Sequence, residues 1–555
     1  MQPLLPQEND VTLNILAVTS EAFPLAKTGG LGDAVSGLAQ ATHQCAASVT
    51  LLLPLHRGVS PHLRRVREVA VLSDLPGGEA TLLAGYCPAL GLPVLALKND
   101  DLYDRDGLYL NAEGEEYADN AIRFAALAHA ATRIAQGRLP IAPPHIVHVH
   151  DWHAALTPLL MHQAGIHDIK SILTLHNVAF QGVFPMALAA SLGIEEKYCQ
   201  DDGAGFWGQI NFLKAGIRFA DLITAVSRNY AREILTPEFG CGLEALLNER
   251  KDRLVAVPNG IDTALWNPQC DPYLKGRQFS ARKLKNKSQC KRALQRAFSL
   301  ECKADTTIMA IGSRLTTQKM ADVAVEAIPR ALDQYPALQV CVMGRGEKHL
   351  EAALLAMSQR YEGRCGVRIG FDESRAHWLH AGADILLHGS RFEPFGLTPL
   401  YAMRYGTIPI GSKVGGMVDT ITDPGPQQPI EAMREATGIL FQGESVQAMN
   451  EAIIRAMALR AHPDIWHAMQ QNGMNADFSW ARTAPEYMRL YHMLAPDPTP
   501  KTNTALARRS LPARLTTAMA PMSISAFKAT TVSGTRKAAP ASENGALKTL
   551  SPHGA

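Results

Sequence analysis

A glycine-rich segment near the N-terminus places a lysine beside bare backbone. Lys27 precedes Gly29 and Gly30, between a short apolar run that ends at Thr19 and an apolar-periodic run from Ala34. At a helix N-terminus, unpaired N–H groups and the helix dipole favour a phosphate or another anion. The spacing matches neither the P-loop nor the dinucleotide-binding fingerprint, so a simple tight connection between strand and helix stays open as the alternative.

The second half of the chain supplies two cations and one carboxylate. Arg314 and Lys319 follow an apolar run and are five residues apart, a spacing that suits a diphosphate clamp or an exposed pair at a helix start. Glu393 stands beside a turn at Gly396, and Thr398-Pro399 predicts a helix with Thr398 as its N-cap. Such a helix start would bind an anion, and a glutamate beside it indicates contact with the hydroxyl groups of a ligand.

Histidines and an aspartate follow two apolar runs in the first half. The segment His148–His153 holds three histidines and Asp151, and His176 with Asn177 follows the next run. A metal site is one interpretation, but no distant cluster completes it, and Asp151 alone is also typical of a helix cap. Asp104–Asp106 matches the D-x-D pattern of metal-dependent sugar transferases only over three residues. We expect no metal.

Short apolar runs alternate with longer helical patterns along the chain. Many of these runs are continuously apolar, as expected for parallel strands covered on both faces. The rhythm predicts two doubly wound α/β domains, in which polar residues at the carboxyl ends of strands form the site. The candidate strands are Leu13–Thr19, Val49–Leu53, Ile146–Val149, Ile172–Leu175, Leu222–Val226, Leu254–Val257, Thr307–Ile311, Leu338–Met343, Val367–Ile369, Asp384–Leu387, Ile408–Ile410 and Gly438–Phe441.

Composition shifts divide the chain into four parts. Residues 11–265 form the first predicted domain, and residues 266–304, rich in lysine, arginine and glutamine, a helical connector on the surface. Residues 305–495 form the second domain, whose final helix is expected to return to the first. Residues 496–555 are basic and poor in aromatic side chains, so we expect a disordered tail.

The bulk composition excludes several classes of function. A net charge of +2 over 555 residues gives no reason to expect nucleic acid or an acidic membrane as the main partner. Nine scattered cysteines form no C-x-x-C pair, which indicates reduced thiols. The chain shows no secretory signal pattern and no apolar run of membrane-spanning length, so a cytoplasmic protein is expected.

Six ordered segments together resemble the bacterial glycogen synthase and plant starch synthase family. The similarity covers roughly residues 13–494. Because the segments are spaced over the whole chain and keep the family's order, chance agreement is implausible. The segments are Lys27–Asp33, Asp151–Ala154, His176–Gly182, Gly208–Gly216, Pro258–Asp262 and Arg391–Met403.

The resemblance implies a fold, substrates and roles for individual residues. The fold would be GT-B, with two Rossmann-like domains facing a deep cleft, and the substrates ADP-glucose and an α-1,4-glucan, either glycogen or maltooligosaccharide. The implied catalytic residues are Asp151, His176, Arg314, Lys319 and Glu393. The implied donor-binding residues are Lys27, Gly29, Gly30, Arg314, Lys319, Glu393, Phe395, Gly396, Leu397, Thr398 and Tyr401. Asp33, Tyr103 and Asn259 are implied on the acceptor side.

The resemblance further implies a retaining glucosyltransferase that needs no cofactor and no metal. Breaking the anomeric bond leaves a negative diphosphate, which fixed cations stabilise. No motif carboxylate fits a nucleophile, so attack from the leaving group's own face is favoured, with a diphosphate oxygen as base. Domain closure would exclude water.

Three residues depart from the family pattern and keep alternatives open. Phe395 stands where members usually have cysteine, Met320 where they have glycine, and Val414 where they have threonine. Phe395 makes its segment more similar to that of related GT-B transferases. A transferase that uses UDP-glucose as donor, or a small acceptor, therefore stays open as an alternative. Met320 and Val414 favour a weakly active glucan-binding paralogue, against which the retention of two cations and a carboxylate argues.

Overall fold

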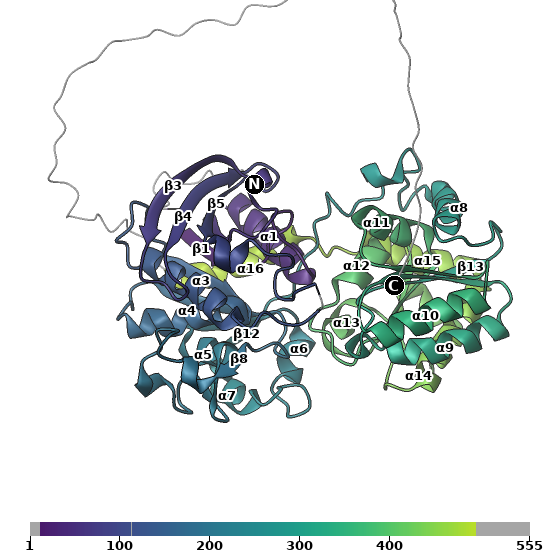
Figure 1. Ribbon diagram of the computed structural model, residues 1–555. Helices are drawn as coiled ribbons and strands as arrows, with labels where there is room; N and C mark the ends of the chain where they lie inside the picture. The colour runs from purple at the N-terminus through teal and green to yellow at the C-terminus, as the bar shows by residue number, and fades with distance from the viewer. Residues whose placement is uncertain (1–11, 113, 496–555) are drawn as a thin grey trace, which may run out of the picture. The chain divides into compact units, whose positions relative to one another are not determined.

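The computed structural model describes residues 12–112 and 114–495, so the predicted tail lies outside the described residues. These residues form two large sheets, each covered by helices, and one small sheet (Figure 1). All twelve predicted strands are present within a residue or two of their expected bounds. No helix in the described ranges is long and apolar enough to cross a membrane.

The first sheet has nine strands and is mixed rather than fully parallel. Strand β4 runs antiparallel to both β3 and β5, whereas the other neighbours are parallel. This antiparallel edge was not predicted from the sequence. Strand β3 carries four charged residues and is largely exposed, whereas β5 is mostly apolar and was overlooked. In spatial order the strands are β12 (Leu254–Ala256), β11 (Leu222–Ala225), β7 (Lys170–Leu175), β6 (Ile146–His150), β1 (Asn14–Val18), β2 (Ser48–Pro54), β5 (Leu92–Lys98), β4 (Ala80–Cys87) and β3 (Arg64–Leu72).

The second sheet has six strands, all parallel, in the order of a doubly wound nucleotide-binding fold. In spatial order they are β15 (Cys365–Ile369), β14 (Leu338–Gly344), β13 (Thr307–Gly312), β16 (Ile385–His388), β17 (Ile408–Ser412) and β18 (Ile439–Phe441). The strand order reverses between β13 and β16, and between β1 and β6 in the first sheet. Ligands bind at such switch points, beyond the carboxyl ends of the strands.

Helices cover both sheets. Those of the first half are α1 (Gly30–Gln44), α2 (Asp100–Tyr103), α3 (Asn120–Ala135), α4 (Trp152–Gln163), α5 (Phe212–Phe219), α6 (Arg228–Glu233) and α7 (Glu244–Glu249). Those of the second half are α8 (Lys287–Ala297), α9 (Ala321–Gln334), α10 (Lys348–Arg360), α11 (Glu373–Gly382), α12 (Leu397–Arg404), α13 (Gly415–Thr420), α14 (Val446–Arg460), α15 (Pro463–Asn475) and α16 (Trp480–Leu494).

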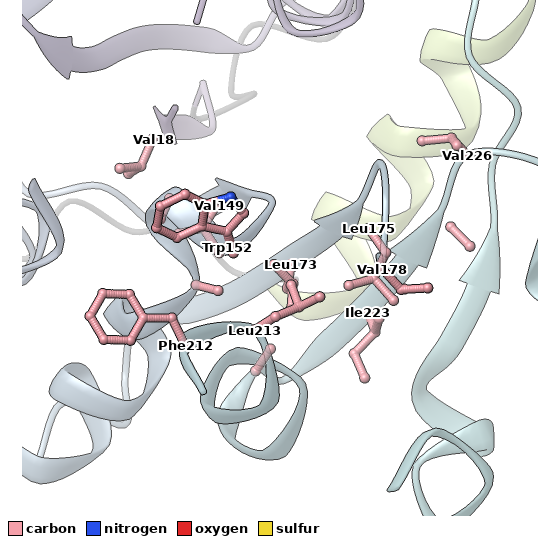
Figure 2. Packing of buried hydrophobic residues seen from close by; sticks show 14 of the residues in the cluster. Val18, Val149, Trp152, Leu173, Leu175, Val178, Phe212, Leu213, Ile223 and Val226 are labelled. Atoms are coloured by element: carbon pink, nitrogen blue, oxygen red, sulfur yellow. The ribbon is translucent and has the colours of Figure 1, made fainter. Parts of the chain in front are cut away.

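The core of the first sheet is built from strand and helix side chains that meet on one face. Figure 2 shows Leu173 and Leu175 of β7 among the side chains of this core, together with Phe212, Leu213 and Trp152. All five are less than a tenth exposed. Because β6 and β7 are buried on both faces, their carboxyl ends are held rigidly, and the loops that follow carry Asp151 and His176.

The last helix, α16, packs against α1 of the first half. Gly37 of α1 permits this approach, since a Cβ there would lie 1.9 Å from Nε1 of Trp480. Tyr491 on α16 lies with its hydroxyl 2.9 Å from Nδ1 of His148 on β6. The predicted connector contains α8, which packs against α11 and buries Lys287 and Lys291, so this segment is less exposed than its charge indicates.

A small antiparallel sheet stands beside the first large sheet. It consists of β8 (Val183–Pro185), β10 (Gln209–Asn211) and β9 (Gly205–Phe206), in that order. This small sheet was not predicted from the sequence, because three strands of two or three residues are too short to show a periodic pattern.

Candidate active site

The switch point of the second sheet brings Lys319 and Glu393 together. Lys319 follows β13 and Glu393 follows β16, so residues 74 positions apart end at the same edge of the sheet. Nζ of Lys319 donates to Oε2 of Glu393, and Nε2 of His388 lies 3.0 Å from the same oxygen. Only about a tenth of each charged side chain is exposed. The spacing of these two predicted site residues in the sequence gave no indication that their side chains touch.

The environment keeps the Glu393 carboxyl ionised. Burial raises its pKa, but the charge of Lys319 and the hydrogen bonds with Lys319 and His388 outweigh burial and hold the pKa below its usual range. Burial lowers the pKa of His388, so its imidazole is neutral at neutral pH. Glu393 is therefore a carboxylate with one buried cation beside it, ready to accept hydrogen bonds from ligand hydroxyls.

Two arginines near this pair have different roles. Arg314 is exposed, and its Nη2 donates to Oε1 of Gln318 at 2.8 Å. Arg391 holds the segment before Glu393 in place, because its guanidinium forms two hydrogen bonds with the carboxylate of Asp322 and a third with Glu444. Arg314 is exposed, as a residue that contacts a ligand has to be. Arg391 is bonded to two carboxylates of the protein, as is typical of a structural residue.

Glycines let the backbone after Glu393 approach its neighbours closely. Gly396 has φ +89° and is the N-cap of α12, which begins at Leu397. The predicted start at Thr398-Pro399 was therefore wrong by two residues, because Gly396 adopts the left-handed conformation that other residues avoid. At Gly415, which has φ +50°, a Cβ would lie 1.6 Å from the carbonyl oxygen of Glu393.

The N-terminus of α13 offers a test of one departure from the family. Val414 is the N-cap residue, in extended conformation, and valine has no side-chain acceptor for the first N–H groups. Replacing Val414 with threonine is expected to raise the unfolding free energy by about 1 kcal/mol, because a threonine hydroxyl caps a helix. Urea unfolding of Val414→Thr beside Val414→Ala measures this. Equal stability of the two variants would show that capping is not limiting here.

The glycine-rich loop of the first half is already occupied by a carboxylate. Glu21, after β1, accepts hydrogen bonds from the N–H and hydroxyl of Thr28 at 2.6 and 2.7 Å and from the N–H of Gly29 at 3.3 Å. Its other contact is the hydroxyl of Tyr109, which donates at 2.7 Å. The N–H groups of Thr28 and Gly29, just before α1, are therefore paired within the protein. Glu21 thus fixes the glycine-rich loop, and Lys27 is the charged residue at the start of that loop.

Lys27 belongs to a second charged cluster, which joins α1 to helices of the second half. Its Nζ lies 2.9 Å from Oδ2 of Asp33 and 3.8 Å from Oε2 of Glu373. The hydroxyl of Tyr401 donates to the same Asp33 oxygen at 3.4 Å. Burial raises the pKa of Asp33 and Lys27 offsets only part of this. The exposed ring of Phe371 lies 5.8 Å from the Lys27 ammonium.

Tyr401 is held by an aromatic stack. The ring of Trp266 lies between Tyr401, at 3.9 Å, and His377, at 4.0 Å, and is nearly parallel to both. Asp271 accepts from the Tyr405 hydroxyl at 2.7 Å and lies 2.8 Å from Nδ1 of His377. Burial lowers the pKa of His377, but Asp271 and Glu373 outweigh it and raise the pKa above its ordinary value.

Asp151 lies at the switch point of the first sheet in a strained conformation. Its backbone has φ 55° and ψ −175°, a region that is almost restricted to glycine. Oδ1 accepts hydrogen bonds from the N–H groups of His176 at 2.7 Å and Asn177 at 3.1 Å. Burial raises the pKa of Asp151 to about 7, against these two bonds. The Asp151 side chain therefore does not cap α4, which was one interpretation of the sequence. It connects the end of β6 to the loop after β7.

The histidines around Asp151 are buried or half-buried and neutral. Nδ1 of His150 lies 3.1 Å from Nε2 of His176, and burial lowers the pKa of His176 to about 3. His153 stacks on Tyr109, whose hydroxyl bonds to Glu21. Asp151, His176 and the glycine-rich loop are thus connected through packed side chains.

Three other predicted site residues lie in the protein interior. Tyr103 is 1% exposed and its hydroxyl donates to the carbonyl of Arg123. Asn259 is buried in the loop after β12, with its N–H on the carbonyl of Val226. Phe395 is 3% exposed and packs in the apolar core. Within the described ranges, no cluster of three or more His, Cys, Asp or Glu side chains is arranged to hold a metal ion.

The sequence analysis missed four residues that shape the site: Glu21, Glu373, His388 and Trp266. Glu373 and Trp266 act on Lys27 and Tyr401, which are distant in the sequence, so no local motif signals them. Glu21 and His388 lie only eight and five residues from Gly29 and Glu393. Glu21 had a local signal, a carboxylate immediately after the strand that feeds the glycine-rich loop.

The fold and the site define a glycosyltransferase of the GT-B class, with two nucleotide-binding-type sheets. Residues 14–249 match the family model of the starch synthase catalytic domain, and residues 295–475 that of glycosyl transferases group 1. The chain is similar to the catalytic domain of starch synthase IV from Arabidopsis thaliana bound to ADP and acarbose, with TM-score 0.79 and 28% identity over 88% of this chain and 100% of that one. A sucrose-phosphate synthase from Thermosynechococcus elongatus, at 18% identity and TM-score 0.55, shares the fold over 87% of this chain and 99% of its own.

Curated bacterial relatives are more similar in sequence. Glycogen synthase from Bordetella petrii is 56% identical over 483 residues, which cover 87% of this chain and 93% of that protein. Glycogen synthase from Ralstonia nicotianae is 51% identical over 491 residues, 88% of this chain and 90% of that protein. The chain therefore belongs to the glycogen synthase and starch synthase family, as its six motifs predict.

Proposed function

We propose that this protein transfers glucose from ADP-glucose to the non-reducing 4-hydroxyl of an α-1,4-glucan, with retention of the anomeric configuration. The observation that carries the proposal is the buried Lys319–Glu393 pair at the switch point of the second sheet. A cation beside a carboxylate suits a substrate that combines a diphosphate with sugar hydroxyls. The Arabidopsis relative was solved with ADP and acarbose, a combination that supports the same substrate classes here.

The donor diphosphate meets cations from both halves in this proposal. Lys319 and the exposed Arg314 neutralise it, and the first N–H groups of α12, after Gly396, add donors at a helix N-terminus. Lys27 is contributed by the first half, where it contacts Asp33, and it also lies near Glu373 of the second half. These charges are fixed before the reaction, so they stabilise the developing negative charge without reorganisation.

Glu393 and the Asp151 loop are proposed to hold the sugar being transferred. Glu393 accepts hydroxyl hydrogen bonds as an ionised carboxylate, while His176 and Asp151 lie on the side of the incoming glucan hydroxyl. Phe371, beside Lys27 and exposed, offers an apolar face to the nucleobase.

The reaction step is proposed as attack from the leaving group's own face. The glycosidic C–O bond to the diphosphate breaks, the glucan 4-oxygen bonds to the anomeric carbon, and the hydroxyl proton passes to a diphosphate oxygen. Glu393 is already bound by Lys319 and His388, which suits a hydrogen-bond acceptor for sugar hydroxyls better than a nucleophile.

The alternative donors and the inactive paralogue have weaker support. Phe395 packs into the core, so this departure from the family changes packing behind the site rather than a ligand contact. Met320 takes the left-handed conformation, φ 52°, at a position where the family has glycine, and it is fully buried. The contact of its neighbour Lys319 with Glu393 is kept.

The free, scattered cysteines support a cytoplasmic location.

Glucose incorporation into glycogen by the purified full chain tests the proposal. ADP-glucose and UDP-glucose are compared as donors, with EDTA present, and the product is digested with an α-specific glucosidase. EDTA-insensitive transfer from ADP-glucose into α-linked product is expected. Transfer from UDP-glucose alone would contradict the donor, a β-linked product would contradict retention, and no transfer from either donor would contradict the enzymatic function.

A further inference from the structure

An exposed tryptophan at the tip of a hairpin has no role in the site described above. Trp207 and Gly208 connect β9 to β10, and both have positive φ, 49° and 77°. Phe206 pairs with Gln209 across this two-residue loop, so the loop has the φ pattern of a type I′ turn. Such turns strongly favour asparagine, aspartate or glycine, whereas an aromatic residue is strained there. Trp207 therefore occupies a strained position at the tip of the hairpin, and its indole is exposed.

The indole is both exposed and fixed. Trp207 is 78% exposed, yet its ring lies 4.3 Å from that of Phe206 at an angle of 30°. The edge of the indole rests on Gly242, where a Cβ would lie 2.7 Å from Cη2 of Trp207. A ring that neighbours hold in place loses little conformational freedom when a ligand stacks on it, which favours binding.

Hydrogen bonds connect the segment beneath Trp207 to the loop that carries His176. Gln181, at the other end of that loop, donates to the carbonyl of Cys241 at 2.9 Å and accepts from the side-chain amide of Asn211 at 2.6 Å. Cys241 precedes Gly242, on which Trp207 rests. In the same loop Phe180 is also exposed, by 46%. Trp207 is thus connected, through Gly242 and Gln181, to the loop that carries His176.

We propose that Trp207, backed by Phe206, binds the α-1,4-glucan chain at a distance from its reacting end. The faces of a glucose ring carry C–H groups and stack on aromatic rings, and a neutral polymer needs no charged partner there. The site rests on the proposed function for its ligand, and it extends that function from the terminal glucose to the body of the polymer. It holds long acceptors and contributes nothing to short ones.

The test compares Trp207→Ala with Trp207→Phe, which keeps an aromatic face, and with Tyr86→Ala, an exposed aromatic on β4, as the matched control. Migration in native gels that contain glycogen measures binding without turnover. For Trp207→Ala we expect glycogen affinity to fall and the KM for glycogen to rise about five- to tenfold. The KM values for maltotriose and ADP-glucose, and kcat, stay unchanged, as do all values for Tyr86→Ala.

Each outcome bears on the proposal separately from the proposed function. Glycogen affinity of Trp207→Ala equal to that of the wild type overturns the glucan site. If the wild type sediments as a dimer and Trp207→Ala as a monomer, with unchanged glycogen affinity, the glucan site is also overturned and the surface is assigned to a second copy. If the wild type transfers no glucose, the proposed function fails, but the gel still tests the site. Loss of affinity in both Ala variants alike overturns the assignment to Trp207.

Discussion

Replacing Glu393 with glutamine is expected to lower kcat for glucosyl transfer about 10²–10³-fold while the protein stays folded. Glutamine keeps the size of the side chain and an acceptor oxygen for Lys319, but it removes the negative charge that holds the sugar hydroxyls and balances the ammonium. Steady-state kinetics with ADP-glucose and glycogen, together with thermal unfolding, measure both effects.

The alanine variant is a poorer test than the sequence indicates. In the structure, alanine leaves the Lys319 ammonium buried without its partner, a change that costs about 3–5 kcal/mol. Glu393→Ala is therefore expected to lose stability as well as activity, so only the glutamine variant separates the two.

A second buried ion pair on the same strand provides the matched control. Asp384 stands immediately before β16, at the opposite end from Glu393, and accepts from Nζ of Lys291 at 2.8 Å and from the N–H of Ile308 at 2.9 Å. Asp384→Asn is expected to lose stability with kcat unchanged. Turnover of a folded Glu393→Gln variant at the wild-type rate would remove Glu393 from the site.

Acidification below about pH 6.5 is expected to destabilise the first half of the chain strongly. Four buried histidines and one half-buried histidine there have pKa values lowered chiefly by burial: His56, His148, His150 and His153, and the half-buried His176. The values for His56, His148 and His176 fall to about 3. Because the unfolded chain binds protons at these groups below about pH 6.5 and the folded chain does not, stability is lost as the pH falls.

The size of this effect follows from the number of groups. Between about pH 7.5 and 5.5 each such histidine removes about 1 kcal/mol of stability, so the five together rival the whole stability of a domain. Asp151 acts in the opposite sense, because its raised pKa of about 7 adds stability as the pH falls through that value. One carboxyl offsets only part of five imidazoles.

Thermal unfolding at about pH 7.5, 6.5 and 5.5 measures the effect. His148→Gln removes one titrating group that lies between Tyr491 and Thr174, and its stability should depend less steeply on pH. His349→Gln, at an exposed position, is the matched control and should keep the wild-type slope. Stability that stays constant between pH 7.5 and 5.5 would show that the buried histidines are not neutral.

The sequence determined the strands, the motifs and through them the family. Runs such as Leu338–Met343 are mostly apolar, and a buried parallel strand is a local property that a reader of the sequence can recognise. Family motifs such as Lys27–Asp33 and Arg391–Met403 are local as well. The two-residue strand β9 escaped notice because it is too short to show a pattern, and the charged, largely exposed β3 gives no apolar signal.

The tertiary structure alone decided how these residues act on one another. Spacing made Lys319 and Glu393 candidates, but only the reversal of strand order between β13 and β16 brings them into contact. The occupation of the glycine-rich loop by Glu21, and the burial that sets the Asp151 pKa, likewise depend on partners many residues away. Hydrophobic periodicity acts over a few residues, whereas charge pairing, desolvation and backbone strain arise from neighbours that only the folded chain assembles.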